Sequence, residues 1–241
     1  MDRVLYAELT PSAFQQRLAA APIAYLPLGT LEWHGPHLPL GADGIQSQGF
    51  FEALAQRVGG IVLPALFLGP DCVVERDGAE YYGMDILGFP DGAPRQLPGS
   101  AYWVYDTLFA RLLTGIMRQL KRAGFRIVVA HGHAPSTQAF LGLRPEWDHL
   151  GLQIFVCWRE DESDGLGIQT DHAAANETSL VMALRGDLVD MGRLPEDPTE
   201  SILAVNGDDP RMHASAERGR RAIALQMDRM ATLLRDALHN R

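Results

Sequence analysis

The segment TLEWHGPHLPLGADG, residues 30–44, concentrates potential metal ligands in a stretch rich in glycine and proline. Glu32 and His34 are two residues apart directly after an apolar run, and an extended backbone there would point both side chains the same way. Asp43 lies beyond a turn-rich segment that can fold it back over the first two. One imidazole and two carboxylates suit zinc, manganese or iron. The alternative for this segment alone is two solvated acids and a packed histidine.

Two further histidines follow a second apolar run. Residues 125–130 predict a buried strand, and His131 and His133 come directly after it. Because ligands bind at the carboxyl ends of the strands in an open parallel sheet, we expect both histidine-bearing loops at the edge where sites form. For His131, a role as a ligand and a role supporting a ligand or capping the loop both stay open.

The third cluster is DHAAANETS, residues 171–179. Asp171 and His172 precede a predicted helix, and Glu177 lies in its first turns. Glu177 is five residues after His172, which is poor spacing for one helix face, so His172 belongs to the preceding loop. Alternatively, Glu177 is only a carboxylate stabilised by the N-terminus of the helix, and His172 is an ordinary surface histidine.

The elements that must position these residues alternate along the chain. Apolar, β-branched runs alternate with amphipathic stretches, which predicts an α/β protein whose mainly parallel sheet is covered by helices. Strands are expected at 23–29, 60–66, 125–130 and 152–158, and helices at 44–58, 101–124, 176–186 and 218–241. Residues 69–100 interrupt the pattern with four prolines and six glycines, and residues 159–167 form a polar loop. The first of these is expected to be a long surface excursion, a kind of segment that often carries function.

Composition excludes several classes of protein. The chain has 241 residues, 46% of them hydrophobic, enough for one large α/β domain without disulfides. A net charge of -9 disfavours nucleic acid as a partner, and no strand is followed by a glycine-rich phosphate loop. Cys72 and Cys157 form no framework, and neither a secretory signal nor a run long enough to span a membrane is visible. These features predict a reduced, cytoplasmic location.

Taken together, the three clusters resemble the creatininase (creatinine amidohydrolase) family. The first matches its segment G-(S/T)-x-E-x-H-G-P-H-L-P-x-x-x-D through Gly29, Thr30, Glu32, His34, Gly35, Pro36, His37, Leu38, Pro39 and Asp43. The second matches (I/V)-N-G-H-G-G-N through Gly132 and His133, and the third matches H-A-G-x-x-E-T-S through His172, Ala173, Glu177, Thr178 and Ser179. Residues 97–100, LPGS, are similar to F-P-G-T before the family's long helix. The resemblance runs from about residue 5 to about residue 190.

This resemblance implies a three-layer α/β/α sandwich with a mainly parallel central sheet, in one hydrolase domain over residues 1–241. It also implies a homo-oligomer, with a hexamer or trimer favoured, and two divalent ions per subunit: zinc, manganese or both, with iron as an alternative. By position, Glu32, Asp43 and His133 would hold one ion. His34 and the bridging Asp43 would hold the other. Creatininase supplies its remaining carboxylate where this chain has Pro135, so we assign that role to Glu177.

The departures from the family pattern surround the expected ligands. His131, Ala134, Pro135 and Ser136 replace the asparagine and glycines of the second motif. Trp33 stands between Glu32 and His34, and Ala174 stands where glycine is typical. These changes alter the walls of the site more than its ligand set. They argue against creatinine as the substrate, because its enzyme uses a ligand that Pro135 removes.

The expected function is a metal-dependent amidohydrolase that cleaves a non-peptide C–N bond in a small-molecule cyclic amide, formamide or linear amide with metal-activated water. His172 is the expected catalytic acid, with Asp171 either orienting it or capping the next helix, and Glu177 completes the catalytic centre. One alternative is a family peptidase or deformylase with a larger modified substrate. The other is a catalytically silent binding or assembly subunit. Glu75, Arg76, Tyr81, Tyr82 and Trp158 are expected either to form a lid or to pack between subunits.

Overall fold

The computed structural model describes residues 3–101, 103–157 and 166–239. Its central sheet has four strands in the order β2-β1-β5-β6, and all three pairings are parallel. These strands are β1 (Ile23–Leu28), β2 (Ile61–Val62), β5 (Ile127–Gly132) and β6 (Gln153–Val156). The mainly parallel sheet is therefore confirmed. The expected strand over 60–66 is shorter, because Pro64 has no N–H for a ladder; only a single bridge from Leu66 to Leu28 follows it.

Alternate residues of the central strands enter two different cores. Ile23 and Tyr25 of β1 join one hydrophobic cluster, while Ala24 and Leu26 join another. The same alternation runs along β5. Every residue of β1 and β5 is buried, which fits a parallel sheet with both faces covered.

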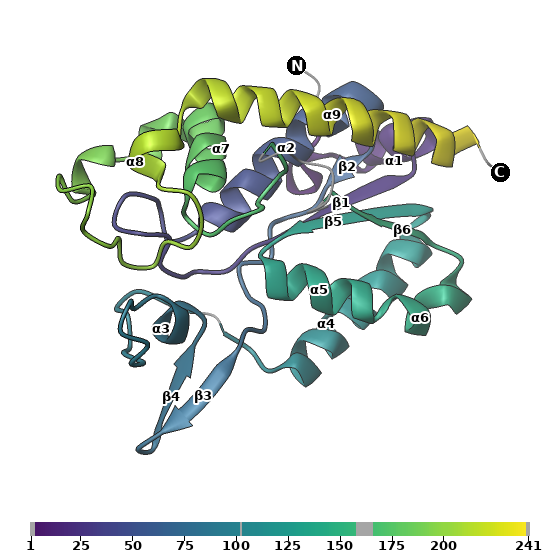
Figure 1. Ribbon diagram of the computed structural model, residues 1–241. Helices are drawn as coiled ribbons and strands as arrows, with labels where there is room; N and C mark the ends of the chain where they lie inside the picture. Colours follow the sequence, from purple (N-terminus) through teal and green to yellow (C-terminus); the bar gives the residue numbers. More distant parts are fainter. Residues whose placement is uncertain (1–2, 102, 158–165, 240–241) are drawn as a thin grey trace.

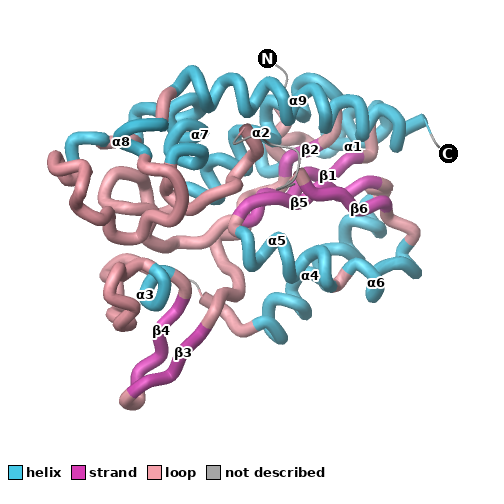
Figure 2. Tube along the Cα trace, in the orientation of Figure 1, coloured by secondary structure: helices cyan, strands magenta, loops and turns pink. Residues whose placement is uncertain are grey.

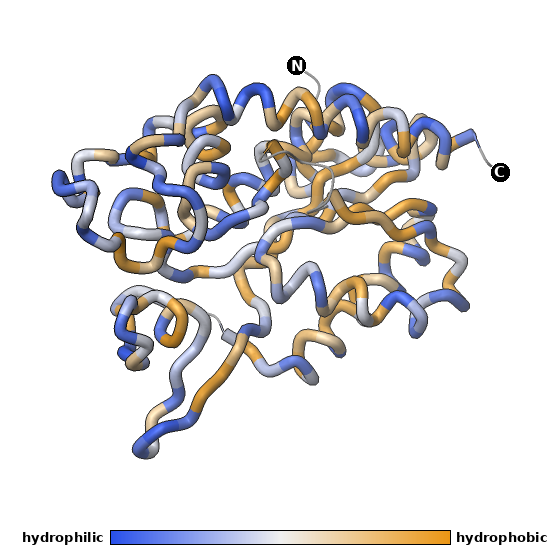
Figure 3. Tube along the Cα trace, viewed as in Figure 1, coloured by the Kyte–Doolittle hydropathy of each residue, from blue (hydrophilic) through white to orange (hydrophobic). Residues whose placement is uncertain are grey.

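Helices cover the two faces of the sheet and complete the three layers (Figure 1). One face carries α2 (Ala42–Val58), α7 (Ala175–Arg185) and α9 (Ala216–His239), and the other carries α4 (Asp106–Ala123), α5 (Ala134–Gly142) and α6 (Arg144–Trp147). Hydrophobic residues fill the central strands, whereas α9 alternates between hydrophobic and hydrophilic residues (Figure 3). The three-layer sandwich predicted from the sequence is confirmed.

The helix α4 shows how the sequence sets these elements. Its buried residues Phe109, Leu113, Met117 and Leu120 recur every three or four positions, so one stripe faces the sheet. It ends at Gly124, whose left-handed φ of 101° closes the helix as the sequence predicted. It begins at Asp106, five residues later than expected, because residue 105 is extended.

The remaining elements lie mainly outside these layers. They are η1 (Tyr6–Glu8), α1 (Pro11–Ala20), β3 (Val73–Arg76), β4 (Ala79–Tyr82), α3 (Met84–Leu87), η2 (Asp148–Leu150), η4 (Gly186–Leu188), η5 (Met191–Arg193) and α8 (Pro210–His213). The predicted excursion over 69–100 thus contains an antiparallel hairpin, β3–β4, and the short α3. The hairpin projects away from the central sheet (Figure 2). Trp158 and most of the predicted loop 159–167 lie outside the described residues. Within the described part of the chain, no helix has the length and apolar character needed to cross a membrane.

Candidate metal centre

The six side chains singled out in the sequence gather at the carboxyl ends of β1 and β5. Glu32 and His34 follow β1, and His133 directly follows β5. Gly132 allows the ends of β1 and β5 to lie close together. A Cβ at this position would lie 1.5 Å from the carbonyl oxygen of Leu28, so no other residue fits. The remaining side chains come from α7 and the loop before it, and from α2. Asp43, expected in a loop, lies in the first turn of α2, which begins two residues earlier than predicted.

One group of donors consists of Glu32, Asp43 and His133. A ligand atom from each lies within 4.8 Å of the other two, and all three residues are buried. The Nε2 atom of His133 is 3.4 Å from a Glu32 carboxylate oxygen. Its Nδ1 is 3.1 Å from the Ser136 hydroxyl. A proton donated from Nδ1 to that hydroxyl leaves Nε2 free to bind an ion.

A second group consists of His34, Asp43 and Glu177, again with one ligand atom each within 4.8 Å. The Nε2 atom of His34 is 3.4 Å from Asp43 Oδ2 and 3.8 Å from Glu177 Oε1. Its Nδ1, 3.1 Å from the Glu32 carbonyl oxygen, donates to that oxygen when it carries the proton. His34 Nε2 and Asp43 Oδ2 are buried without a hydrogen-bond partner among the described residues.

These distances fit a pair of ion positions that share Asp43. Two ligand atoms held about 2.0–2.1 Å from a tetrahedral zinc ion are roughly 3.3–3.4 Å apart. The His34–Asp43 and His133–Glu32 separations, both 3.4 Å, match that spacing. Buried polar atoms without a partner are costly, and a cation would satisfy both orphaned atoms. The residues therefore fit two divalent ions.

Neighbouring amides hold the carboxylates in place. Gln46 donates its side-chain amide to Glu177 Oε1 at 2.8 Å, and the Ala173 backbone N–H donates to Glu177 Oε2 at 2.6 Å. Gln169 donates to Asp43 Oδ1 at 2.8 Å. Neither glutamine was singled out in the sequence. For Gln46 a signal existed, because it lies three residues after Asp43 and so near one face of α2.

The charges of the centre shift the pKa values of its histidines. Burial alone would lower the pKa of His34, but the carboxylates of Glu177 and Asp43 outweigh it and raise the value to about 10. Burial would also lower the pKa of His133, but the nearby carboxylates outweigh burial and raise this pKa to about 10. Burial raises the pKa of Glu177, and the neighbouring His34 opposes this shift. Without metal, both imidazoles are therefore protonated near neutral pH.

This protonation predicts proton release when metal binds. Because a ligating imidazole must be neutral, binding of two ions at pH 7 should expel about two protons or more. Raising the pH empties these sites of competing protons, so affinity should increase from pH 6 to pH 9. Calorimetric titration of chelator-stripped protein with Zn²⁺, in buffers of different ionisation enthalpy, measures the number released. Binding without proton release, or affinity that falls as the pH rises, would contradict this prediction.

His172 lies against the second group of donors. Its ring stacks on that of His34, with centroids 4.5 Å apart, and its Nε2 is 2.8 Å from the Trp33 carbonyl oxygen, to which it donates. Backbone hydrogen bonds in both directions with Asn206 fix the segment. Burial first, and then the nearby His34, lower the pKa of His172, so its imidazole is neutral near pH 7.

Asp171 and His131 lie near the centre but outside the two proposed ligand sets. The Asp171 carboxylate accepts the backbone N–H groups of Asn176 and Glu177 at 2.7 and 2.9 Å, so of the two predicted roles it has the helix-capping one. No described contact joins Asp171 to the His172 side chain. His131 is buried, at 1% exposed, and belongs to none of the donor groups among the described residues.

The donors open into a cavity of about 460 Å³. Its lining includes Glu32, Asp43, His133 and His172, together with Asp71, which the sequence did not single out. The hairpin residues expected as a lid are not among the described lining residues. Tyr82 instead stacks on Trp103, whose ring lies 5.8 Å from that of His133.

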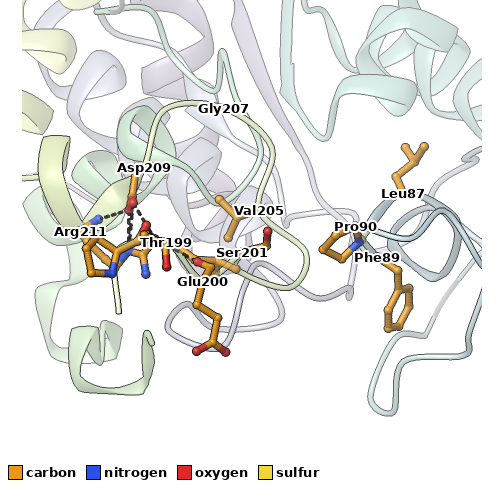
Figure 4. Close-up of a pocket in the computed structure, with 13 residues that line it drawn as sticks. Leu87, Phe89, Pro90, Thr199, Glu200, Ser201, Val205, Gly207, Asp209 and Arg211 are labelled. Carbon is orange, nitrogen blue, oxygen red and sulfur yellow. Dashed lines mark hydrogen bonds and ion pairs between the residues drawn. The ribbon is translucent and has the colours of Figure 1, made fainter. Parts of the chain in front are cut away.

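A second cavity, of about 430 Å³, adjoins the first and shares Leu87 and Gly207 with it. It lies between residues 87–90 and residues 198–211 (Figure 4). Arg211 in its wall is already engaged, because it donates to Asp209 and to four backbone carbonyl groups between residues 195 and 200. Arg211 therefore stabilises the conformation of the loop over residues 195–200.

Comparison with known proteins identifies the family. Residues 7–234 match the family model Creatininase, described as creatinine amidohydrolase. The chain belongs to the creatininase family. Creatinine amidohydrolase from Pseudomonas putida is 28% identical to it over 221 residues, which cover 81% of this chain and 77% of the relative.

Solved structures of creatininases share the fold. A crystal structure of creatinine amidohydrolase superimposes with a TM-score of 0.76 at 22% identity and covers 100% of both chains. A mutant creatininase of Zn-Zn type gives a TM-score of 0.74 at 22% identity and covers 98% of this chain and 99% of its own. The creatininase-like α/β architecture expected from the resemblance is confirmed.

Proposed function

We propose that this creatininase-family chain is a metal-dependent amidohydrolase that cleaves a non-peptide C–N bond at a centre for two divalent ions, zinc or manganese. Glu32, Asp43 and His133 would hold one ion, and His34, Asp43 and Glu177 the other. The main observation is that Asp43 belongs to both fully buried donor groups, and that His34 Nε2 and Asp43 Oδ2 have no hydrogen-bond partner among the described residues. Membership of the family supports the reaction class, and a related creatininase of Zn-Zn type supports the metal.

His172 is in position to transfer the proton that the reaction needs. When bound, two divalent ions lower the pKa of water and polarise a carbonyl oxygen. The leaving nitrogen needs a proton, because an amide anion is a very poor leaving group. His172 is neutral near pH 7, so it first accepts a proton from the attacking water and then donates it to the leaving nitrogen. Trp33 holds the ring through its carbonyl oxygen during this transfer.

Glu177 replaces the carboxylate that Pro135 cannot provide. Pro135 lies in the first turn of α5 and lines the cavity, where it contributes no ligand atom. The carboxylate of Glu177 comes instead from α7, held by Gln46 and by the Ala173 backbone. A carboxylate from α7 in place of one from α5 would keep the ligand set for this ion and leave a different side chain in the wall of the cavity.

These walls favour a substrate other than creatinine. We propose a cyclic amide, a formamide or a small linear amide as the substrate class. The adjoining 430 Å³ cavity favours a second candidate, a peptidase or deformylase with a larger modified substrate whose remote part occupies that space. A homo-oligomeric state and a cytoplasmic location stay predictions.

A substrate panel tests this proposal. Chelator-stripped protein, and the same protein reloaded with Zn²⁺ or Mn²⁺, should be incubated with cyclic amides, formamides and short and extended linear amides, and the carboxylate formed by hydrolysis measured. We expect hydrolysis in the reloaded protein only. Turnover restricted to extended compounds would favour the second candidate. A protein that binds both ions yet hydrolyses no member of the panel would favour the silent subunit.

A further inference from the structure

The cavity of the metal centre meets the second cavity at Leu87 and Gly207, which line both. Leu87, the last residue of α3, is 61% exposed. Residues 87–90 lie across the second cavity from Val205 and Ser201 (Figure 4). Volumes of about 460 and 430 Å³ are each in the range of small-molecule sites. The two cavities can therefore hold the reacting amide of a substrate and a more distant part of it, its tail.

The second cavity adjoins the metal centre on the side where His172 lies. Asn206, the neighbour of Gly207, also lines the cavity of the metal centre, and its backbone exchanges hydrogen bonds of 2.9 and 2.8 Å with that of His172. Gly207 lies against the same segment, because a Cβ there would be 2.8 Å from the Cβ of Asp171. A tail that reaches the second cavity past Gly207 thus passes the segment that carries His172.

The position of His172 decides which end of the substrate bears this tail. In the proposed hydrolysis the oxygen of water bonds to the acyl carbon, the C–N bond breaks, and the amine leaves with a proton from His172. The leaving nitrogen must therefore lie toward His172. Because the second cavity adjoins the metal centre on that side, the tail belongs to the amine part of the substrate.

The described linings of the two cavities offer no free cation to this tail. Arg211 is the only lysine or arginine among them. All of its guanidinium nitrogens donate to the Asp209 carboxylate or to backbone carbonyl groups between residues 195 and 200. Thr199 and Ser201 add hydroxyl oxygens, which accept hydrogen bonds. A negatively charged tail would lose hydration without gaining a cationic partner, whereas a tail with N–H or O–H donors would meet acceptors.

We infer that the second cavity binds the amine part of the substrate, which is an amide of an extended amine whose tail carries hydrogen-bond donors and no negative charge. This inference rests on the proposed function and narrows its substrate class. Binding of a remote part of the substrate can be used to orient the reacting bond, so it raises kcat as well as lowering KM. Amides that occupy only the cavity of the metal centre should be slow substrates.

A pair of isomeric amides tests this assignment. In the first isomer a hydroxyl-bearing chain is attached to the nitrogen and the acyl group is short; in the second the chain is on the acyl side and the nitrogen substituent is short. We expect the wild type loaded with Zn²⁺ or Mn²⁺ to hydrolyse the first with a kcat/KM at least about tenfold higher. Replacing the terminal hydroxyl of the first isomer by a carboxylate should lower kcat/KM by about tenfold or more.

Bulky substitutions in the second cavity provide the matched test. Ser201→Trp should fill this cavity and reduce the preference for the first isomer at least about tenfold. Leu87→Trp, where the two cavities meet, is a second variant should Ser201→Trp fold poorly, as judged by thermal unfolding. Leu108→Trp is the control, because Leu108 is 57% exposed but lies outside both described linings. The preference of the control should stay within about twofold of wild type.

The outcomes separate this inference from the proposed function. A wild type that hydrolyses both isomers equally well, or prefers the second, would overturn the assignment of the second cavity and leave the proposed function intact. An unchanged preference in folded Ser201→Trp and Leu87→Trp would overturn it in the same way. A wild type that binds both ions and hydrolyses no amide would overturn the proposed function, on which this inference depends.

Discussion

Replacing His172 with alanine should lower kcat by about 10²–10⁴-fold while both metal ions remain bound. The ring stacks on His34 and, together with Glu32 and His34, forms a third group of possible donors, but it belongs to neither of the two proposed ligand sets. Its loss should therefore remove proton transfer and leave the proposed ligands intact. The measurement is steady-state kinetics on the best substrate of the panel, together with metal content of the same preparation. His149→Ala is the control, since His149 is exposed and belongs neither to the donor groups nor to the described lining of the cavity.

A second variant separates proton transfer from packing at this position. His172→Gln keeps an N–H that can donate to the Trp33 carbonyl oxygen, yet an amide cannot carry a proton in the working pH range. We expect the glutamine variant to lose as much activity as the alanine variant. Near-normal turnover in His172→Gln would show that the ring acts by position alone, and loss of metal from His172→Ala would make His172 a ligand.

Local rules predicted that the donors of this candidate centre would lie close together, whereas their division into two ligand sets stays a prediction from the family resemblance. Glu32, His34 and His133 come directly after buried strands, and the ends of parallel strands meet at one sheet edge. Asp43 and Glu177 lie in the first turns of α2 and α7, so the helical layer on one face of the sheet provides the other donors. These relationships depend on element type and order, which hydrophobic spacing reveals.

Other parts of the centre depend on contacts that no local pattern encodes. Asp71 meets His133 across 62 residues, and Gln46 meets Glu177 across 131. The hairpin β3–β4 was predicted only as part of a long surface excursion, because all four residues of β3 are exposed and no burial periodicity marks the strand. Asp171 had two plausible roles, and only the folded backbone shows that its carboxylate caps α7.

Replacing Glu177 with alanine should remove one of the two ions and most of the activity. Only His34 and Asp43 would remain as donors for that ion, and two protein ligands hold zinc poorly. The ion at Glu32, Asp43 and His133 should remain, because none of its ligands is changed. Glu217→Ala is a matched control, since Glu217 also lies in the first turn of a helix but is exposed.

Metal content per subunit tests the central claim most directly. Wild type, Glu177→Ala and Glu217→Ala should be purified without chelator, loaded with Zn²⁺ or Mn²⁺, freed of excess ion and subjected to elemental analysis. A dinuclear centre completed by Glu177 predicts about two ions in wild type and in Glu217→Ala, and about one in Glu177→Ala. Two ions retained by Glu177→Ala would contradict the assignment of Glu177, and no ion in the loaded wild type would contradict the metal centre as a whole.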